Sequence, residues 1–375
     1  MRCAVLSLCV LFGAVVTVRA DDPPTKDEAL EKSVDRALAF LQSTQLADGS
    51  WGAGSQLQRF DMHKPAVTSL CVMAFLSAGN VPGEGRYGET VEKGIRWVLQ
   101  HQQDNGLFAG NGAQEMYHHG ICTLMLAEAA GMTDSKLGAE IRKRLVKAVD
   151  VILKAQRDGE GEDRGGWRYR MAHIEGSDIS VTGWQIMALR AAKNIGCDVP
   201  ADRIDRAVDF IKRCQDSQTG GFRYQPHANL TIPCTGTSIL ALELCGKDLH
   251  RGPEVLKAGA LLLSIPPYWD ASNGPQWGDK ASEQRKWNTS FGFYGLYYCS
   301  QATFQLGGNY WDFFRPILRD MLFKNQKDNG SWVGENQDGK GGGPTYSTAM
   351  CVLALTVEYR YLPIYQRGEE PTDKK

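Results

Sequence analysis

The stretch Gln45-Leu46-Ala47-Asp48-Gly49-Ser50-Trp51 returns almost unchanged near the other end of the chain, as Gln326-Lys327-Asp328-Asn329-Gly330-Ser331-Trp332. Four more divergent copies lie between these two, and each of them keeps the closing aromatic residue. The six aromatics are Trp51, Phe108, Trp167, Phe222, Trp277 and Trp332. The steps between them are 57, 59, 55, 55 and 55 residues. A period this regular predicts a fold built from repeated supersecondary units.

Each copy has the same predicted anatomy. Apolar residues at helical spacing precede the Gln, as Val34, Leu38 and Leu41 do in the first copy. The Gly then ends this helix and turns the chain. A second helix follows, more apolar and richer in small residues, and such helices are expected at residues 66–78, 121–130, 181–192, 235–244 and 347–357. No stretch shows the sustained alternation of a strand, so we expect an all-α fold of six αα-hairpins that can close into a two-ring barrel.

The repeat residues themselves are expected to be structural. The Gln can hydrogen-bond the backbone of the next hairpin, and the Trp indole N–H can find a partner beside the turn. The second helices also share a polar position, which holds Thr68, His119, Thr182, Thr235, Thr289 and Ser347. Helix capping is the simplest explanation for Thr and Ser there. His119 breaks the pattern, and its neighbour His118 must point about 100° away from it on a helix.

The charge balance disfavours nucleic acid as a partner. The 375 residues include 42 Lys and Arg against 43 Asp and Glu, which gives a formal net charge of −1. A neutral surface has no field to attract a phosphate backbone. The apolar fraction of 42% is ordinary for a soluble globular protein.

Residues 1–20 have the pattern of a secretory signal peptide. Arg2 is followed by an apolar run of about 16 residues, and Val18-Arg19-Ala20 offers a cleavage site before Asp21. An uncleaved anchor is the alternative, but the run is short for a span of about 20 residues. We therefore expect a signal peptide at 1–20, a loose segment at 21–27, a repeat domain at 28–365 and a charged tail at 366–375. The mature protein would be periplasmic or extracellular, with no stable membrane span and eight cysteines that could form one or two disulfides.

The Q-x-x-D-G-S-W copies resemble the QW repeats of squalene–hopene cyclases and of protein prenyltransferase β subunits, the prenyltransferase and squalene oxidase repeat family. The resemblance covers roughly residues 28–365. It implies an (α/α)6 toroid whose ligand site is the central cavity, at the mouth formed by the N-termini of the inner helices.

Neither catalytic set of these families is present in this sequence. Where the cyclases carry D-x-D-D-T, this chain has Asp178, Ser180, Val181 and Thr182, so a serine stands at the proton-donor position. The zinc ligands of the prenyltransferases are also missing: the expected Asp-x-Cys reads Trp287-Asn288-Thr289, and no His opens the sixth inner helix. Another metal site would need three of a scattered set to converge on one ion, and no close ligand spacing supports it. The set is His118 or His119, Asp178, His63, His173, His227 and Cys234. We therefore expect no metal and no cofactor.

The residues proposed to line the cavity are Asp178, His119, Glu115, Thr182, Trp287, Phe291 and Tyr346. The aromatic members suit an isoprenoid chain, although they would also suit sugar rings or core packing.

Three functions follow as hypotheses. The first is an exported toroid that binds an isoprenoid or another apolar ligand; if it is an enzyme, it would be transferase- or cyclase-like. The second is a non-catalytic secreted binding or scaffold protein, whose protein partner the sequence does not identify. The third is a polysaccharide lyase or hydrolase, for which Glu115 and Asp178 are the only plausible carboxylate pair.

Overall fold

The computed structural model describes residues 27–52, 63–109, 114–133, 136–173, 176–245, 250–278 and 291–366. The predicted signal peptide, nearly all of the predicted loose segment, most of the charged tail and Trp287 lie outside these residues.

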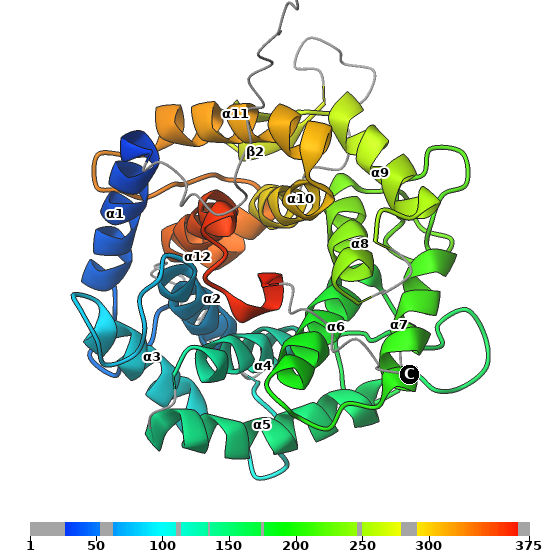
Figure 1. The fold of residues 1–375 in the computed structure, drawn as a ribbon, viewed down its shortest axis with the longest axis horizontal. Helices are drawn as coiled ribbons and strands as arrows, with labels where there is room; N and C mark the ends of the chain where they lie inside the picture. Colours follow the sequence, from blue (N-terminus) through cyan, green and yellow to red (C-terminus); the bar gives the residue numbers. More distant parts are fainter. Residues whose placement is uncertain are drawn as a thin grey trace, which may run out of the picture.

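Twelve α-helices of the described chain form two concentric rings (Figure 1). The inner ring consists of α2 (Lys64–Ser77), α4 (Glu115–Gly131), α6 (Ile179–Asn194), α8 (Ile232–Cys245), α10 (Gly292–Leu306) and α12 (Gln337–Leu355). The outer ring consists of α1 (Glu28–Ser43), α3 (Gly88–Gln100), α5 (Lys136–Ala155), α7 (Ala201–Arg213), α9 (Pro253–Ser264) and α11 (Gly308–Asn325). Each inner helix contacts the next one, and α12 packs against α2, which closes the ring. The predicted all-α (α/α)6 toroid is confirmed.

Burial separates the two rings in the way that their composition predicts. Every residue of α2 from Pro65 to Ser77 is buried, whereas α7 buries a single apolar stripe. The inner helices also approach one another closely. A Cβ atom at Gly236 of α8 would lie 2.8 Å from the Sγ of Cys299 on α10, so a larger residue would push these helices apart.

The fifth repeat departs from the helical pattern. Strands β1 (Pro267–Asp270) and β2 (Gly274–Trp277) form a small antiparallel hairpin in which Pro267 pairs with Trp277. This copy lacks the Gln six residues before its aromatic, where Ala271 stands instead. The strand pairing supplies the backbone hydrogen bonds of this turn, and the prediction of helices alone missed it.

The repeat Gln joins each turn to the next outer helix. Gln45 donates from Nε2 to the carbonyls of Gly49 and of Thr90 on α3, both at 2.9 Å. The same pair of bonds recurs at Gln102, Gln156, Gln215 and Gln326. The turn glycine is required as well. Gly49 has a φ of +91°, and a Cβ there would lie 2.8 Å from the carbonyl oxygen of Lys93.

The turn Trp donates a hydrogen bond to a backbone carbonyl at the C-terminal end of the preceding outer helix. The indole N–H groups of Trp51, Trp167 and Trp332 donate to carbonyls in the last turns of α1, α5 and α11, at 2.6, 2.8 and 2.9 Å. Carbonyls in the last turn of a helix lack the usual donor four residues further on, so the indole supplies a hydrogen bond there. The predicted structural roles of the Gln and the Trp are therefore confirmed.

The C-terminal segment fills one end of the inner ring. After α12, the short helices η2 (Thr356–Tyr359) and η3 (Pro363–Tyr365) run across the middle of the toroid (Figure 1, red). The Ile364 N–H donates to Oε2 of Glu128 on α4 at 3.1 Å, and the hydroxyls of Tyr365 and of Tyr297 on α10 lie 3.1 Å apart. Glu128 lies near the C-terminal end of α4, whereas Tyr297 lies in the N-terminal half of α10.

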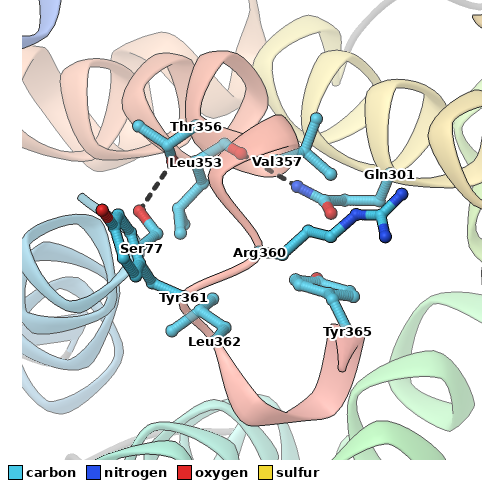
Figure 2. A pocket seen from close by; sticks show the side chains of 9 residues that line it. All are labelled: Ser77, Gln301, Leu353, Thr356, Val357, Arg360, Tyr361, Leu362 and Tyr365. Atoms are coloured by element: carbon cyan, nitrogen blue, oxygen red, sulfur yellow. Dashed lines mark hydrogen bonds between the residues drawn. The ribbon is translucent and has the colours of Figure 1, made fainter. Parts of the chain in front are cut away.

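A small pocket remains between this C-terminal segment and the inner helices (Figure 2). Thr356 donates to Ser77 of α2 at 2.8 Å, and Gln301 of α10 donates to the Leu353 carbonyl at 2.9 Å. The first bond ties the segment to α2, and the second joins α10 to the end of α12, from which the segment continues. The opposite end of the ring, where the inner helices begin, is thus the end at which the resemblance expects a ligand.

No helix in the described part of the chain is long and apolar enough to span a bilayer. All eight cysteines beyond the predicted signal peptide are described, and all are free thiols. Six of them are buried.

Candidate functional site

Three tyrosines from three different inner helices gather at the N-terminal end of the inner ring. Tyr117 on α4 and Tyr346 on α12 are half-buried, and Tyr294 on α10 is buried. Burial raises the pKa of each phenol well above its usual range, and electrostatic interaction couples Tyr117 to Tyr294 and to Tyr346. Aromatic rings with a polar tip thus line this part of the ring.

Asp178 sits behind Tyr117 as the N-cap of α6. Its Oδ1 accepts from the Val181 N–H at 3.0 Å and from the Ser180 hydroxyl at 2.6 Å. Ser180 in turn accepts from the Tyr117 hydroxyl at 2.5 Å. The hydrogen bonds therefore run in one direction, from the phenol through the serine to the carboxylate.

The second oxygen of Asp178 faces a cation. Arg168 Nη1 lies 3.5 Å from Oδ2, and the guanidinium stacks over the rings of Tyr169 and Tyr224. Burial raises the pKa of Asp178 to about 6. The hydrogen bonds from Ser180 and Val181 lower this pKa, as does the charge of Arg168, but they only partly offset the effect of burial. The helix N-terminus thus does not hold the pKa at its ordinary value, although the group is still mostly ionised at pH 7.

Asp338 is a second carboxyl at this end of the ring, and sequence reasoning missed it. Its Oδ2 accepts from the Tyr294 N–H at 2.8 Å and from the Tyr346 hydroxyl at 3.3 Å. Burial raises its pKa to about 7, although the residue keeps some accessible surface. The available signal was Asn336, which caps α12 through the Gly339 N–H. The glycine-rich stretch around it has the composition of a loop, which hides this helix start.

His119 and Thr182 point away from the ring centre. His119 Nδ1 accepts from the Phe108 N–H at 3.0 Å, and Nε2 donates to the Ala148 carbonyl of α5 at 2.9 Å. Thr182 accepts from the Trp167 N–H at 3.0 Å. Both side chains are fully buried. Their proposed place in the cavity is therefore wrong, because their polar atoms are used by the repeat backbone.

The same bond explains the shared polar position of the inner helices. The backbone N–H of the turn aromatic donates to a threonine hydroxyl on the inner helix, and this bond also occurs at Thr68 and Thr235. In the sixth repeat the residue is Thr348, one position beyond the predicted Ser347. Thr289 lies outside the described residues.

His118 points elsewhere, as the 100° rule predicts. Its Nε2 lies 3.1 Å from Nδ1 of His63 at the start of α2. Burial lowers the pKa of His118 to about 3 and also lowers that of His63, so both imidazoles are neutral at pH 7. In the described part of the chain, no three His, Cys, Asp or Glu side chains converge in a way that could hold a metal ion.

The remaining candidates lie at the rim. Glu115 accepts from the Met171 N–H at 2.6 Å and so holds the segment that follows Trp167. Phe291 precedes α10 and is 43% exposed. Tyr346 lies within the tyrosine group, whereas Trp287 is outside the described residues.

Solved structures share this fold at low sequence identity. The type II terpene cyclase MstE from Scytonema aligns with a TM-score of 0.59 and 16% identity, over 88% of this chain and 98% of that one. An α-1,6-mannanase of Salegentibacter sp. HEL1_6, solved with α-1,6-mannotriose, aligns with a TM-score of 0.63 and 9% identity, over 88% and 98%. The protein geranylgeranyltransferase-I of Candida albicans, complexed with GGPP, aligns with a TM-score of 0.54 and 12% identity, over 86% and 90%. These likenesses show the fold alone.

A sequence family accounts for most of the chain. No match to the sequence was found among curated proteins. The family model of the prenyltransferase alpha-alpha toroid domain matches residues 3–161 and 166–261, which is more than half of the chain. Together with the closed double ring and its repeated Gln and Trp contacts, this match shows that the chain belongs to the prenyltransferase alpha-alpha toroid family.

Proposed function

We propose that this protein is an exported toroid that binds an isoprenoid or another apolar molecule at the N-terminal end of its inner ring. The observation that carries the proposal is the tyrosine group formed by Tyr117, Tyr294 and Tyr346, which come from three inner helices. The C-terminal segment is held by Ser77 and Glu128 near the C-terminal ends of α2 and α4, so a ligand would enter from the tyrosine side.

Two structural neighbours support an isoprenoid ligand. MstE has been solved with geranylgeranyl dihydroxybenzoate, and the geranylgeranyltransferase with GGPP. Both proteins hold a geranylgeranyl chain on the fold that this chain shares. Aromatic side chains suit such chains because they offer large apolar surfaces without breaking hydrogen bonds.

The proposed role is binding rather than cyclisation by the family chemistry. Ser180 stands where the cyclases carry their acid, and a hydroxyl of ordinary acidity cannot protonate an alkene. Asp178 accepts hydrogen bonds from Ser180 and Val181, which fits an ionised carboxylate and not a proton donor. We therefore expect no conversion of squalene by the unaltered protein.

A carbohydrate-degrading function has less support, despite the mannanase among the neighbours. A glycosidase needs two carboxyl groups that flank the scissile bond. Asp178 is fully buried behind Ser180, and Glu115 is engaged with the Met171 backbone. This pair does not present two free carboxyls to a sugar.

The test is native mass spectrometry of the secreted, full-length mature protein, combined with solvent extraction of any lipid that copurifies. We expect an isoprenoid adduct and a mature N-terminus at Asp21. A tightly bound oligosaccharide would contradict the proposal, and hopene-like products from squalene would contradict the binding-only role. Retention of the protein in the cytoplasm would contradict export.

A further inference from the structure

The tyrosines at the ring entrance use their only hydroxyl hydrogen within the protein. Tyr117 donates to Ser180 at 2.5 Å, and Ser180 passes the interaction on to Asp178. Tyr346 donates to Asp338 at 3.3 Å. A phenol has one hydrogen to donate, so the hydroxyl oxygens of these two half-buried residues can still act only as acceptors. The chain that ends on a carboxylate strengthens this acceptor through polarisation.

The charges that act most strongly on these tyrosines are acidic. Asp178 acts on Tyr117 and Tyr294, and Asp338 acts on Tyr346. Arg168 faces Asp178 and stacks on Tyr169, so its charge is directed at this carboxyl group. The two histidines at the start of α2 and on α4 are neutral at pH 7.

One hydroxyl deeper in the ring has no partner. Tyr298 on α10 is fully buried, its ring centroid lies 4.7 Å from that of Tyr294, and its hydroxyl forms no hydrogen bond. A buried hydroxyl without a partner has lost its hydrogen bonds to water without replacing them, which is unfavourable. Gly183 on α6 faces it: a Cβ atom there would lie 3.7 Å from the Tyr298 oxygen. A polar atom of a ligand beside Tyr294 would relieve this cost.

We propose that the isoprenoid bound here ends in a neutral hydroxyl group, as a prenyl alcohol does, and not in a diphosphate. This inference rests on the proposed function. An alcohol donates its hydrogen to the Tyr117 or Tyr346 oxygen and accepts one from Tyr298. A diphosphate offers acceptors only, and its negative charge would face the carboxyl groups of Asp178 and Asp338.

The experiment compares geranylgeraniol with geranylgeranyl diphosphate, which share the same hydrocarbon chain. Calorimetric titration of the full mature protein measures both affinities. We expect the alcohol to bind at least about tenfold more tightly, which corresponds to one good hydrogen bond. Tyr117→Phe should reduce the alcohol affinity several-fold. Tyr87→Phe is the matched control, because Tyr87 is a buried tyrosine without a hydroxyl partner at the outer helix α3.

The outcomes separate the two proposals. Diphosphate binding as tight as alcohol binding would overturn the hydroxyl preference and leave an isoprenoid site in place. Failure of both compounds to bind would overturn the proposed function itself. Unchanged alcohol affinity in both Tyr117→Phe and Tyr346→Phe would overturn the assignment of these oxygens as acceptors. The second variant keeps the test valid if the first one does not fold.

Discussion

Replacing Gln326 by Leu should weaken the joint between the last repeat and the first. The Nε2 group of Gln326 donates to the carbonyls of Ser33 on α1 and of Gly330, both at 2.9 Å. Its Oε1 accepts from the Ser33 hydroxyl at 3.0 Å. Leu has a similar volume, so the variant removes these three bonds with little change in packing.

The expected magnitude follows from the number of bonds. A protein hydrogen bond contributes about 0.5–1.5 kcal/mol net, and a carbonyl left without a partner adds to the loss. Three bonds at this half-buried site thus give a loss of roughly 2–4 kcal/mol in the free energy of unfolding. In a domain of this size, that corresponds to a fall in melting temperature of roughly 3–6 °C.

The assay is urea denaturation followed by circular dichroism, with Gln45→Leu as the matched control. Gln45 makes the equivalent bonds to Gly49 and Thr90, inside the chain of repeats and not at its closure. A closed toroid predicts losses of similar size for both variants. An open array of hairpins needs no joint between its ends. An unchanged Gln326→Leu variant beside a destabilised Gln45→Leu variant would therefore refute the closed ring.

Three further predictions concern stability and organisation. Trp332→Ala should lower the free energy of unfolding by about 3–5 kcal/mol, because a fully buried indole is removed; a loss of ligand binding at unchanged melting temperature would contradict this role. Limited proteolysis should trim the ends and cut long loops such as 158–165, while two stable fragments that separate without denaturant would contradict a single toroid. Burial raises the pKa of Asp338 to about 7, above its unfolded value near 4, so the folded state binds more protons between these values. Stability from this group should therefore decrease as the pH rises from about 4 to 7, and urea titrations of Asp338→Asn should lack that component; an identical pH dependence in both proteins would count against it.

The architecture was predictable because the same local solution is repeated. Gln45 and Gln326 lie in nearly identical heptapeptides and make the same two carbonyl contacts. A fixed turn with one glycine, one amide and one indole leaves little freedom for the helices that it joins. The C-terminal segment was not predicted, since its contacts, such as Ile364 with Glu128, join residues far apart in sequence.

The site was harder to predict, because it depends on the rotation of each inner helix. Helix α4 begins at Glu115, earlier than its apolar pattern suggests, and each residue turns the side chain by about 100°. An error of two positions in the alignment of α4 therefore assigns the inward direction to His119, although it is Tyr117 that points inward. Asp338 was missed for a similar reason, since the helical start of α12 before Gly343 has the composition of a loop.

The most direct test of the central claim is to locate a bound isoprenoid. A benzophenone-bearing geranylgeraniol analogue would be photo-crosslinked to the full mature protein, and the labelled peptides would be identified by mass spectrometry. The tyrosine group predicts labels on the peptides that contain Tyr117, Tyr294 with Tyr298, and Tyr346, and competition by unlabelled geranylgeraniol should remove them. Labels confined to the outer helices, or labels that persist under competition, would contradict a ligand site inside the ring.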